Sequence, residues 1–578
     1  MNEQQGTERD TEQDGGGEER RPQAERPDAR RAEAARADAP AEVYDVVVIG
    51  GGPVGENAAD YAIRGTDRTA ALVEAERYGG ECSYWACMPS KALLHPLDVI
   101  AEANHLSGVE QPVRVSPEAL LARRDEWVSH YDDAGQEEWT RSAGIVPVRG
   151  RGRIAGPRLV EVEGQDGSTR RIEAREAVVL ATGSAPVVPE ALRGIAAWGS
   201  RDATGVREVP ERLAIVGGGV VACEAARWMS ALGSRVTMLV RGGSLLGSAE
   251  PFAGEAVAAS LREQGVRILF GVEAERAERP AADPEAGTGV PHGGPARLFL
   301  TSRASSAPGG GGAPSASGSD DSSALRDDSP VAHDESPRNR DGSSKGRDGS
   351  SAEDAPPSAE GEDSLLTVDE VLIATGRRPV LEGLGLDGIG LSARELRGWT
   401  HAGGASPLPE WLYLVGDAAG EAPLTHWGKY RARQVGLAIA SAAAGEDPVA
   451  AFDPGDAAEP VPQVVFTDPQ VSWVGRTAAA AREAGVDVVV HDADYASAAG
   501  AALLRDDASG RARLVVEAGT GELIGASFVG PGTAELLHSA TVAVVGRMTL
   551  ETLRHAVPSY PTASEIWLRL LDAEPRWS

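Results

Sequence analysis

The chain repeats one pattern of residues, and this repeat restricts its possible folds more than any other feature. In the first copy an apolar run precedes a glycine-rich loop at residues 50–55, and a second apolar run ends at Glu74. The second copy has its loop at residues 217–222 and ends at Arg241. The spacing from first glycine to strand-end charge is 24 positions in both copies (50 to 74 and 217 to 241). Alternating strands and helices of this kind predict an α/β fold with two parallel sheets wound on both faces.

The first glycine-rich loop has the residues needed to bind a dinucleotide. Gly50, Gly52 and Gly55 permit a tight turn and a close approach of backbone N–H groups to a pyrophosphate at a helix N-terminus. Glu74 is placed to accept hydrogen bonds from ribose hydroxyl groups. Strand, glycines, helix, second strand and acid occur in the required order, so we predict a dinucleotide site here.

The second loop differs from the first at two positions. Gly217 and Gly219 are retained, but the third small residue is Ala222, and the second strand ends at Val240 and Arg241 without a carboxylate. An arginine at this place can bind a 2′-phosphate, which an acid would repel. We therefore expect NADPH to be preferred over NADH. The alternative is an exposed arginine beside a backbone that tolerates either cofactor.

Cys82 and Cys87 are two of only three cysteines in 578 residues, and they follow the first glycine loop closely. On a regular helix residues i and i+5 point roughly 140° apart, so a bridge between them needs a distorted helix start. Pro89, which lacks an N–H, is one cause of irregularity. Thiols at a helix N-terminus are also more readily ionised. The pair is interpreted as a redox pair; the alternative is two buried structural thiols.

The scarcity of lysine marks another position. The 56 basic residues include only three lysines, at positions 91, 345 and 429. Lys91 follows the cysteine pair closely, and its compact ammonium group is not interchangeable with the planar guanidinium group of arginine. We expect Lys91 to have a specific partner, whereas Lys345 lies in low-complexity sequence.

Composition excludes several classes of protein. A net charge of −31 argues against nucleic acid and anionic membranes as partners, and no apolar run approaches the length of a membrane span. The polar, charged residues 1–42 have no apolar core, so they are not a secretory signal and are expected to be a disordered tail. Three cysteines exclude a disulfide-stapled secreted protein. We expect a cytoplasmic protein.

A Ser/Gly/Asp/Pro-rich tract at residues 303–363 has no residues with which to form a core. Strand-like runs border it at residues 296–300 and 364–368. The tract is therefore expected to be a disordered insertion within a domain. It is interpreted as solvated padding, with a regulatory role as the alternative.

Eight motifs give a specific resemblance. Beyond the two glycine loops and Cys-x4-Cys-x-Pro-Ser-Lys, they are Ala181-Thr182-Gly183, Ala374-Thr375-Gly376, Tyr413-Leu414-Val415-Gly416-Asp417, Val465-Phe466-Thr467-Asp468-Pro469 and Pro561-Thr562-Ala563-Ser564-Glu565. The chain resembles the class I pyridine nucleotide–disulfide oxidoreductases over residues 43–575, apart from the 303–363 tract. The resemblance implies an FAD-binding domain at 43–195 and 370–458, an NAD(P)-binding domain at 196–369, and an α+β dimerisation domain at 459–578. It also implies a homodimer.

The resemblance also implies roles for individual residues. Cys87 would be the sulfur against the flavin and Cys82 the one that exchanges with a small-molecule acceptor. Lys91 would pair with Glu224 beside the flavin. Asp417 would hold the ribityl or phosphate end, and the helix that begins near Thr425 would direct its positive end at the flavin. The remaining cofactor-binding positions implied by these motifs are Thr182, Gly183, Gly376 and Gly416; no metal site is expected.

The chain departs from the family pattern near its C-terminus. Many members have a histidine from the partner subunit that carries the thiol proton, but Tyr560 takes that position here, while Glu565 is present. A free phenol titrates well above an imidazole and is a poorer base at neutral pH. His555 is five residues too early, and we interpret it as structural. Mercuric reductases also have a tyrosine here, but this chain lacks their C-terminal cysteine pair, so mercury reduction is unsupported.

Three functions of different classes follow. The first is an FAD-dependent oxidoreductase that passes electrons from NAD(P)H through the Cys82–Cys87 disulfide to a disulfide or dithiol acceptor, as dihydrolipoyl dehydrogenase does. The second is an enzyme that acts at the flavin alone, such as a quinone reductase or a transhydrogenase. The third is a non-catalytic redox-sensing flavoprotein, suggested only by the long insertion.

Overall fold

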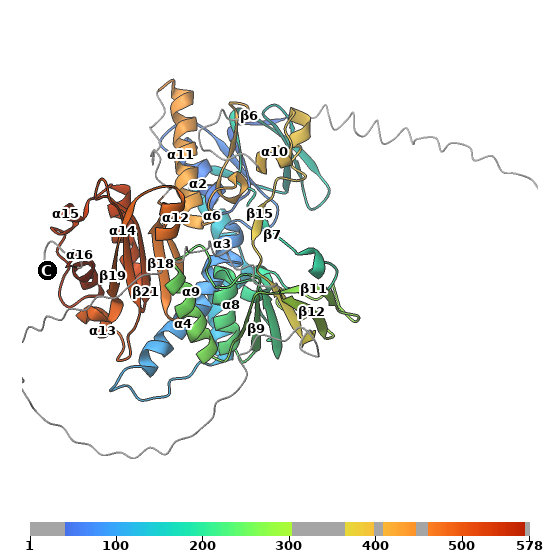
Figure 1. Cartoon of the computed structure of the whole chain (residues 1–578). Coiled ribbons are helices and arrows are strands. Elements are labelled where there is room, and N and C mark those ends of the chain that lie inside the picture. Colours follow the sequence, from blue (N-terminus) through green and yellow to red (C-terminus); the bar gives the residue numbers. More distant parts are fainter. Residues whose placement is uncertain (1–40, 303–364, 398–407, 447–459, 573–578) are drawn as a thin grey trace, which may run out of the picture.

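The computed structural model describes residues 41–302, 365–397, 408–446 and 460–572. The tail expected at residues 1–42 lies outside the described residues except for residues 41 and 42, and the 303–363 tract lies outside them entirely. Figure 1 shows three groups of elements, each built around a sheet of its own. The α/β fold class with a C-terminal α+β domain is confirmed.

The first glycine loop belongs to a seven-stranded sheet. Its parallel part has the order β3-β2-β1-β6-β16, and β5 and β4 continue antiparallel from β6. The strands are β1 (Glu42–Ile49), β2 (Ala70–Glu74), β3 (Ile145–Arg149), β4 (Arg151–Gly156), β5 (Leu159–Glu163), β6 (Thr169–Leu180) and β16 (Leu412–Leu414). Residues more than 200 positions apart therefore complete one sheet.

Two helices of this domain pack unusually close together. These are α2 (Pro53–Ile63) and α11 (Thr425–Ala444), drawn side by side in blue and orange in Figure 1. A Cβ atom at Gly428 would lie 2.7 Å from Val54, and one at Gly436 would lie 2.8 Å from Tyr61. Glycine at both places on α11 therefore allows the two helix axes to approach. The other helices here are α3 (Gly80–Tyr84), α4 (Cys87–Asn104), α5 (Pro117–Trp127) and α6 (Ala134–Ser142).

The second glycine loop belongs to a parallel sheet of order β10-β9-β8-β14. Its strands are β8 (Arg212–Val216), β9 (Arg235–Val240), β10 (Arg267–Phe270) and β14 (Glu370–Ile373), with helices α7 (Ser200–Thr204), α8 (Val220–Ala231) and α9 (Pro251–Glu263). The sequence analysis assigned residue 370 onward to the FAD-binding domain. The strand β14 instead pairs with β8, because its apolar residues complete the second sheet before the chain returns at residues 374–380.

Both parallel sheets carry helices on one face and antiparallel strands on the other. In the second sheet, alternate residues of β8 and β9 pack against α8 and α9. The residues between them pack against a sheet of β11 (Val272–Glu278), β12 (Ala296–Ser302) and β13 (Leu365–Val368). The sequence predicted helices on both faces of each parallel sheet. Helices cover one face as expected, but antiparallel strands cover the other face instead of a second layer of helices. The strands β12 and β13 pair with each other and border the 303–363 tract.

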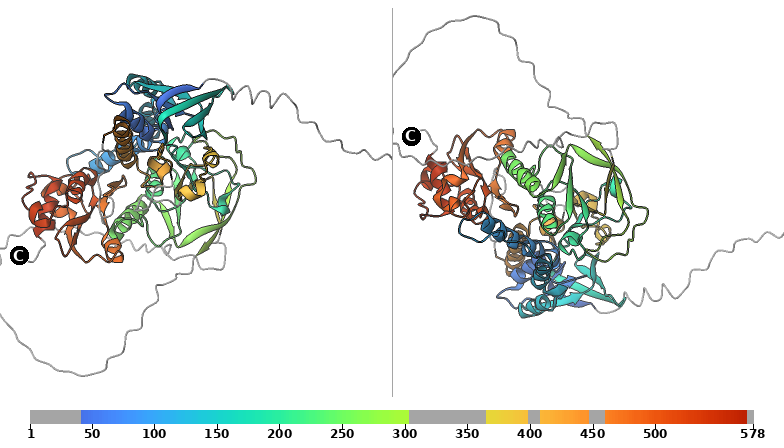
Figure 2. Two further views of the ribbon diagram at one scale, coloured as in Figure 1. Left: turned by 90° about the horizontal axis from the view of Figure 1, so that it is seen from above. Right: turned by 90° about the horizontal axis from the view of Figure 1, so that it is seen from below.

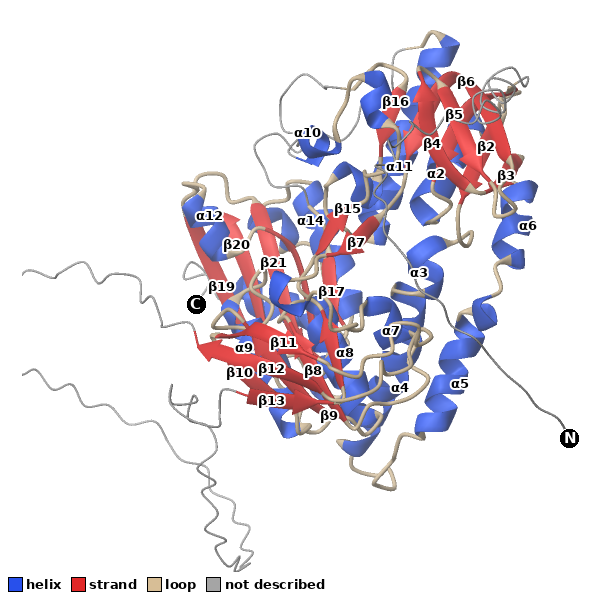
Figure 3. Ribbon diagram, turned by 90° about the vertical axis from the view of Figure 1, so that its right-hand side faces the viewer, coloured by secondary structure: helices blue, strands red, loops and turns tan. Residues whose placement is uncertain are grey.

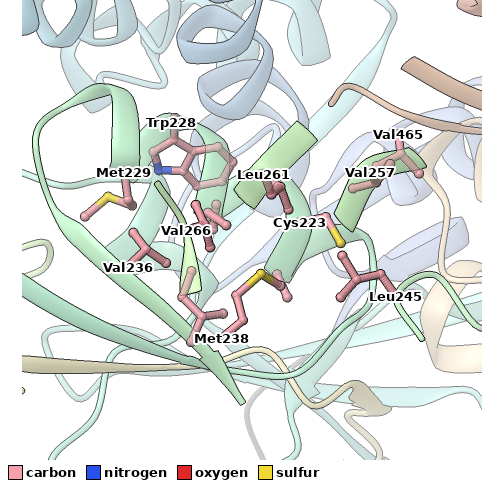
Figure 4. Packing of buried hydrophobic residues seen from close by; sticks show 14 of the residues in the cluster. Cys223, Trp228, Met229, Val236, Met238, Leu245, Val257, Leu261, Val266 and Val465 are labelled. Carbon is pink, nitrogen blue, oxygen red and sulfur yellow. The ribbon is translucent and has the colours of Figure 1, made fainter. Parts of the chain in front are cut away.

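The helix face of the second sheet forms the largest apolar cluster, shown in Figure 4. Cys223 and Trp228 of α8 lie within it at 0% and 1% exposure, among Met238, Leu245 and Val257. Burial raises the pKa of the Cys223 thiol far above its ordinary value. Cys223 is therefore a packing residue and a neutral thiol.

A buried ion pair joins the loop after β11 to the start of β14. Arg279 donates to Glu370 at 2.8 Å and 3.1 Å, and both side chains are fully inaccessible to solvent. His292 donates its backbone N–H to the same carboxylate at 2.8 Å. Arg279 also donates to the carbonyl oxygen of Ala196, where the chain enters this domain. The pair therefore fixes the base of the second domain.

The C-terminal residues form an antiparallel sheet of order β17-β18-β21-β20-β19. Its strands are β17 (Gln463–Val465), β18 (Gln470–Gly475), β19 (Val488–Asp494), β20 (Arg511–Glu517) and β21 (Leu523–Gly530), and its helices are α12 (Ala478–Glu483), α13 (Ala499–Ala502), α14 (Leu537–Val545), α15 (Leu550–Leu553) and α16 (Ile566–Asp572). Figure 2 shows this group in orange and red beside the other two, and Figure 3 labels its strands β17, β19, β20 and β21. None of the helices within the described residues is long and apolar enough to cross a membrane.

Candidate active site

The two cysteines lie on either side of a break between two helices. Cys82 is in α3, which ends at Tyr84, and Cys87 is the first residue of α4. Between them Ala86 has φ −133° and ψ −93°, which is not helical. Both cysteines are free thiols in this structure. The distorted helix start that a Cys82–Cys87 bridge needs is therefore present as a break in the helix.

The two thiols have opposite protonation tendencies. A hydrogen bond from the Cys82 thiol, a hydrogen bond from Thr425 and the charge of Lys91 together lower the pKa of Cys87 to about 6, against the opposing effect of burial. The Thr425 hydroxyl lies 3.4 Å from the Cys87 sulfur. The hydrogen bond to Cys87 and burial raise the pKa of Cys82 above its ordinary value. At neutral pH the pair therefore holds its negative charge on Cys87, at a helix N-terminus that favours a thiolate.

Lys91 has the specific partner that its rarity suggests. Its ammonium nitrogen lies 2.8 Å and 3.1 Å from the two carboxylate oxygens of Glu224, which is 3% exposed. Phe466 donates its backbone N–H to the same carboxylate at 3.0 Å, and its ring centroid lies 4.8 Å from the Lys91 nitrogen. One helix of the first domain, one of the second and a loop of the C-terminal domain therefore meet at this ion pair.

The glycines of the first loop serve two different purposes. A Cβ at Gly55 would lie 1.9 Å from the Gly50 carbonyl oxygen, and one at Gly50 (φ +111°) would lie 2.2 Å from that of Ala181, so packing requires both. A Cβ at Gly52 would meet no atom closer than 3.8 Å. The space in front of Gly52 is therefore left by the protein and suits a phosphate group. Glu74 accepts the Gly51 N–H at 2.7 Å, which fixes its carboxylate at the end of β2.

The second loop repeats this division. A Cβ at Gly217 (φ +138°) would lie 2.3 Å from the Ala374 carbonyl oxygen, whereas one at Gly219 would meet nothing within 4 Å. Ala222 is fully buried in α8. Arg241 follows the last residue of β9 directly and is exposed. The loop therefore leaves open space at Gly219, and Arg241 is exposed at the end of the adjoining strand.

The two Ala-Thr-Gly motifs lie where the chain crosses between the first two domains. Thr182 donates its hydroxyl to Val380 at 2.6 Å, and the Gly183 carbonyl accepts the N–H of Val380 at 3.0 Å. In the other direction, the Gly376 carbonyl accepts the N–H of Val187 at 2.9 Å. The two segments that connect the first and second domains are therefore hydrogen-bonded to each other.

Residues just after these motifs form part of the site that the sequence analysis missed. Arg377 donates to the Ser184 hydroxyl at 2.7 Å, and Ser184 in turn donates to Asp417, which follows Gly416. Arg201 of α7 pairs with Glu81, next to Cys82. Ser184 and Arg377 each come directly after one of the two Ala-Thr-Gly motifs. This shared position could have identified both residues from the sequence.

A cleft of about 800 Å³ adjoins the end of β2. It lies between residues 75–77 of the first domain and Arg201, Arg207 and Thr288 of the second, and Trp85 and Tyr131 also line it. The rings of Trp85 and Tyr131 stack at 4.6 Å. The cleft begins directly after Glu74, and Glu76, Asp132 and Asp133 line it together with these arginines and aromatic rings.

The C-terminal pair lies apart from the cysteines of its own chain. Tyr560 is 78% exposed, and within the described residues its hydroxyl has no hydrogen bond. Glu565 is 7% exposed and accepts the backbone N–H of Gly500 at 3.3 Å. Glu565 is therefore held inside its own domain, whereas Tyr560 is available to another chain. No group of three or more His, Cys, Asp or Glu side chains in the described ranges is arranged to hold a metal ion.

These residues fit FAD and a pyridine nucleotide. The open space at Gly52 and Gly219, the fixed Glu74 carboxylate and the thiolate-favouring start of α4 are the features that each cofactor requires. The comparison with known sequences agrees. Residues 44–289 match the family described as pyridine nucleotide-disulphide oxidoreductase, and residues 461–570 match the dimerisation domain of that family. The chain belongs to the pyridine nucleotide–disulfide oxidoreductases and is an FAD-dependent enzyme.

Similar proteins extend over nearly the whole chain. It is 30% identical to dihydrolipoyl dehydrogenase of Haloferax volcanii, covering 90% of this chain and 94% of that protein. It is 28% identical to dihydrolipoyl dehydrogenase of Thermus scotoductus, covering 92% and 97%. Among solved structures, the Cu(II) complex of the HOCl-induced flavoprotein disulfide reductase RclA of Escherichia coli has a TM-score of 0.65 at 20% identity, covering 92% and 99%. That likeness concerns the fold.

Proposed function

We propose that the enzyme transfers electrons from NADPH through FAD and the Cys82–Cys87 pair to a small disulfide or dithiol acceptor. The observation that carries this proposal is the position of the two cysteines at the break between α3 and α4, where the Thr425 hydroxyl lies 3.4 Å from the Cys87 sulfur. Bound FAD would accept a hydride from the nicotinamide and reduce the disulfide. A homodimer is supported by the matching dimerisation domain. The cytoplasm is the proposed location, consistent with three cysteines in 578 residues.

The chain's own residues have distinct tasks in this proposal. Cys87 holds the negative charge, with the Thr425 hydroxyl and the Lys91 charge as its support. Cys82 exchanges with the acceptor. Glu224 holds Lys91 in place, at 2.8 Å. The loops at Gly52 and Gly219 bind the two pyrophosphates, and Asp417 binds the ribityl chain.

The rates at which the enzyme reduces different electron acceptors test this proposal. The purified enzyme should reduce lipoamide or a small disulfide with NADPH, and should do so faster than a variant that lacks Cys82. Should it reduce only quinones and dyes, at a rate unchanged by Cys82→Ser, electrons leave directly from the flavin. The flavin-level function would then replace the one proposed here.

The cofactor preference should depend on Arg241. A charge-assisted contact to a 2′-phosphate is stronger than a neutral one. In Arg241→Glu the ratio of kcat/KM for NADPH to that for NADH should fall about tenfold or more. Arg235→Gln is the matched control, because Arg235 begins the same strand and pairs with Glu211 instead. Equal kcat/KM for both cofactors in the parent enzyme would contradict the preference for NADPH.

A further inference from the structure

One of the three lysines is not explained by the site described above. Lys91 pairs with Glu224, and Lys345 lies outside the described residues, which leaves Lys429. Lys429 is on α11, one helical turn after Thr425, so both side chains share a face. The Thr425 hydroxyl lies 3.4 Å from the Cys87 sulfur, and Thr425 also lowers the pKa of Cys82. Helical side chains lean toward the N-terminus, which directs the Lys429 ammonium group toward the cysteine pair.

A carboxylate on the neighbouring helix faces the same lysine. Glu56 is in the first turn of α2, and close packing of α2 on α11 through Val54 and Gly428 brings the two first turns together. Glu56 is 8% exposed, and its Oε1 atom is buried without a hydrogen-bond partner. A buried carboxyl oxygen without a partner is costly, so a retained one points to a function.

The electrostatic effects connect the three residues. The Lys429 charge lowers the pKa of Cys82, opposing the effects of Cys87 and burial. Burial raises the pKa of Glu56 to about 7, with Lys429 on α11 lowering it and Glu74 on β2 raising it. Glu56 also helps to raise the pKa of Tyr84 of α3. The charge of Lys429 therefore acts on both Glu56 and Cys82.

We propose that Glu56 is the acid–base catalyst of thiol–disulfide exchange at Cys82, with Lys429 stabilising the Cys82 thiolate. This inference rests on the proposed function and names the proton carrier within the same subunit. Many family members use a histidine to carry the thiol proton, and Tyr560 at that position is a poor substitute. In this proposal Glu56 carries the proton instead.

The exchange balances in protons and electrons. Cys82 gives its thiol proton to the Glu56 carboxylate, and its thiolate attacks one sulfur of the acceptor disulfide. The acceptor S–S bond breaks, a Cys82–acceptor disulfide forms, and the leaving thiolate takes the proton back from Glu56. The Cys87 thiolate then attacks Cys82, which re-forms the Cys82–Cys87 disulfide and releases the second thiolate, protonated by solvent. The two electrons of the cysteine pair thereby reduce one disulfide to two thiols.

The pH dependence of turnover tests the role of Glu56. In the FAD-loaded enzyme, Glu56→Gln should lower the ratio of disulfide to dye reduction about 10²-fold at pH 7 and remove the limb near pH 7 from the pH profile. Glu56→Asp should keep that limb. Arg433→Gln is the matched control, since Arg433 is one turn further along the same face of α11 and donates to Asn57. An unchanged ratio in Glu56→Gln, or loss of FAD in that variant, would overturn the proposal.

Alkylation tests the role of Lys429 without turnover. In Cys87→Ser holoenzyme, iodoacetamide should modify Cys82, while Cys223 is fully buried. Adding Lys429→Gln should slow the modification of Cys82 at pH 7 about tenfold, because a nearby cation favours the thiolate. Lys429→Arg should restore the rate. Equal rates with and without Lys429→Gln would refute its role. An enzyme that reduces no disulfide would refute the proposed function, while this alkylation result would still stand.

Discussion

Cys87→Ser is expected to lower disulfide reduction on the order of 10³-fold or more, as for removal of other essential nucleophiles. The reason is that Cys87 carries the negative charge of the pair, with its pKa lowered to about 6. The two-electron-reduced enzyme should also lose the long-wavelength absorbance that a thiolate gives beside an oxidised flavin. Anaerobic titration with NADPH, followed by absorbance, measures this loss.

Cys82→Ser is the matched control for this result. It should also abolish disulfide reduction, but it leaves the Cys87 sulfur beside Thr425 and Lys91. A thiolate band should therefore persist. Cys223→Ser should change neither property, because Cys223 is packed in the core of the second domain. An unchanged spectrum in Cys87→Ser would show that the cysteines are not coupled to the flavin.

Glu370→Ala should strongly destabilise the second domain. It leaves Arg279 charged, fully buried and without its carboxylate, and removing one partner of a buried pair costs about 3–5 kcal/mol. Native-state hydrogen exchange of the β8 and β14 amides measures this local loss. A matched change is Asp369→Asn, which breaks the neighbouring pair with Arg212.

The side chains of the Arg212–Asp369 pair are both about one-third exposed. Its loss should therefore lower the free energy of unfolding by at most about 1 kcal/mol. Arg279→Met combined with Glu370→Met should recover most of the stability, since well-packed apolar side chains often replace a buried pair without loss. If Glu370→Ala costs no more than Asp369→Asn, the buried pair does not hold the base of the domain.

The repeat in the sequence was enough to predict both parallel sheets, and the five-residue spacing of the cysteines indicated the irregular helix start between them. These features depend on local signals: the glycines at positions 50 and 217, the strand runs around them, and Pro89 after the pair. The position of Lys91 beside Glu224 also followed from the resemblance, and the structure brings the two side chains together at 2.8 Å.

Other features depend on tertiary packing that no local pattern encodes. The assignment of β14 to the second sheet required knowledge of its partner β8, which lies more than 150 residues away. The approach of Glu56 to Lys429 depends on Gly428 allowing two helices to pack closely. The pairing of Glu81 with Arg201 likewise depends on the angle between two domains. Sequence reasoning could name such residues individually but could not pair them.

The backbone contact between Phe466 and Glu224 gives the C-terminal domain a second task. Besides the N–H that reaches Glu224 at 3.0 Å, the Phe466 carbonyl accepts a hydrogen bond from Arg227 of α8 at 3.1 Å. The dimerisation domain thus acts as a mechanical brace on the helix that carries Glu224. A substitution that moves Phe466 should therefore also shift Glu224 and the Lys91 ammonium group that it holds. The C-terminal domain thus holds the carboxylate that pairs with Lys91 as well as forming its own sheet.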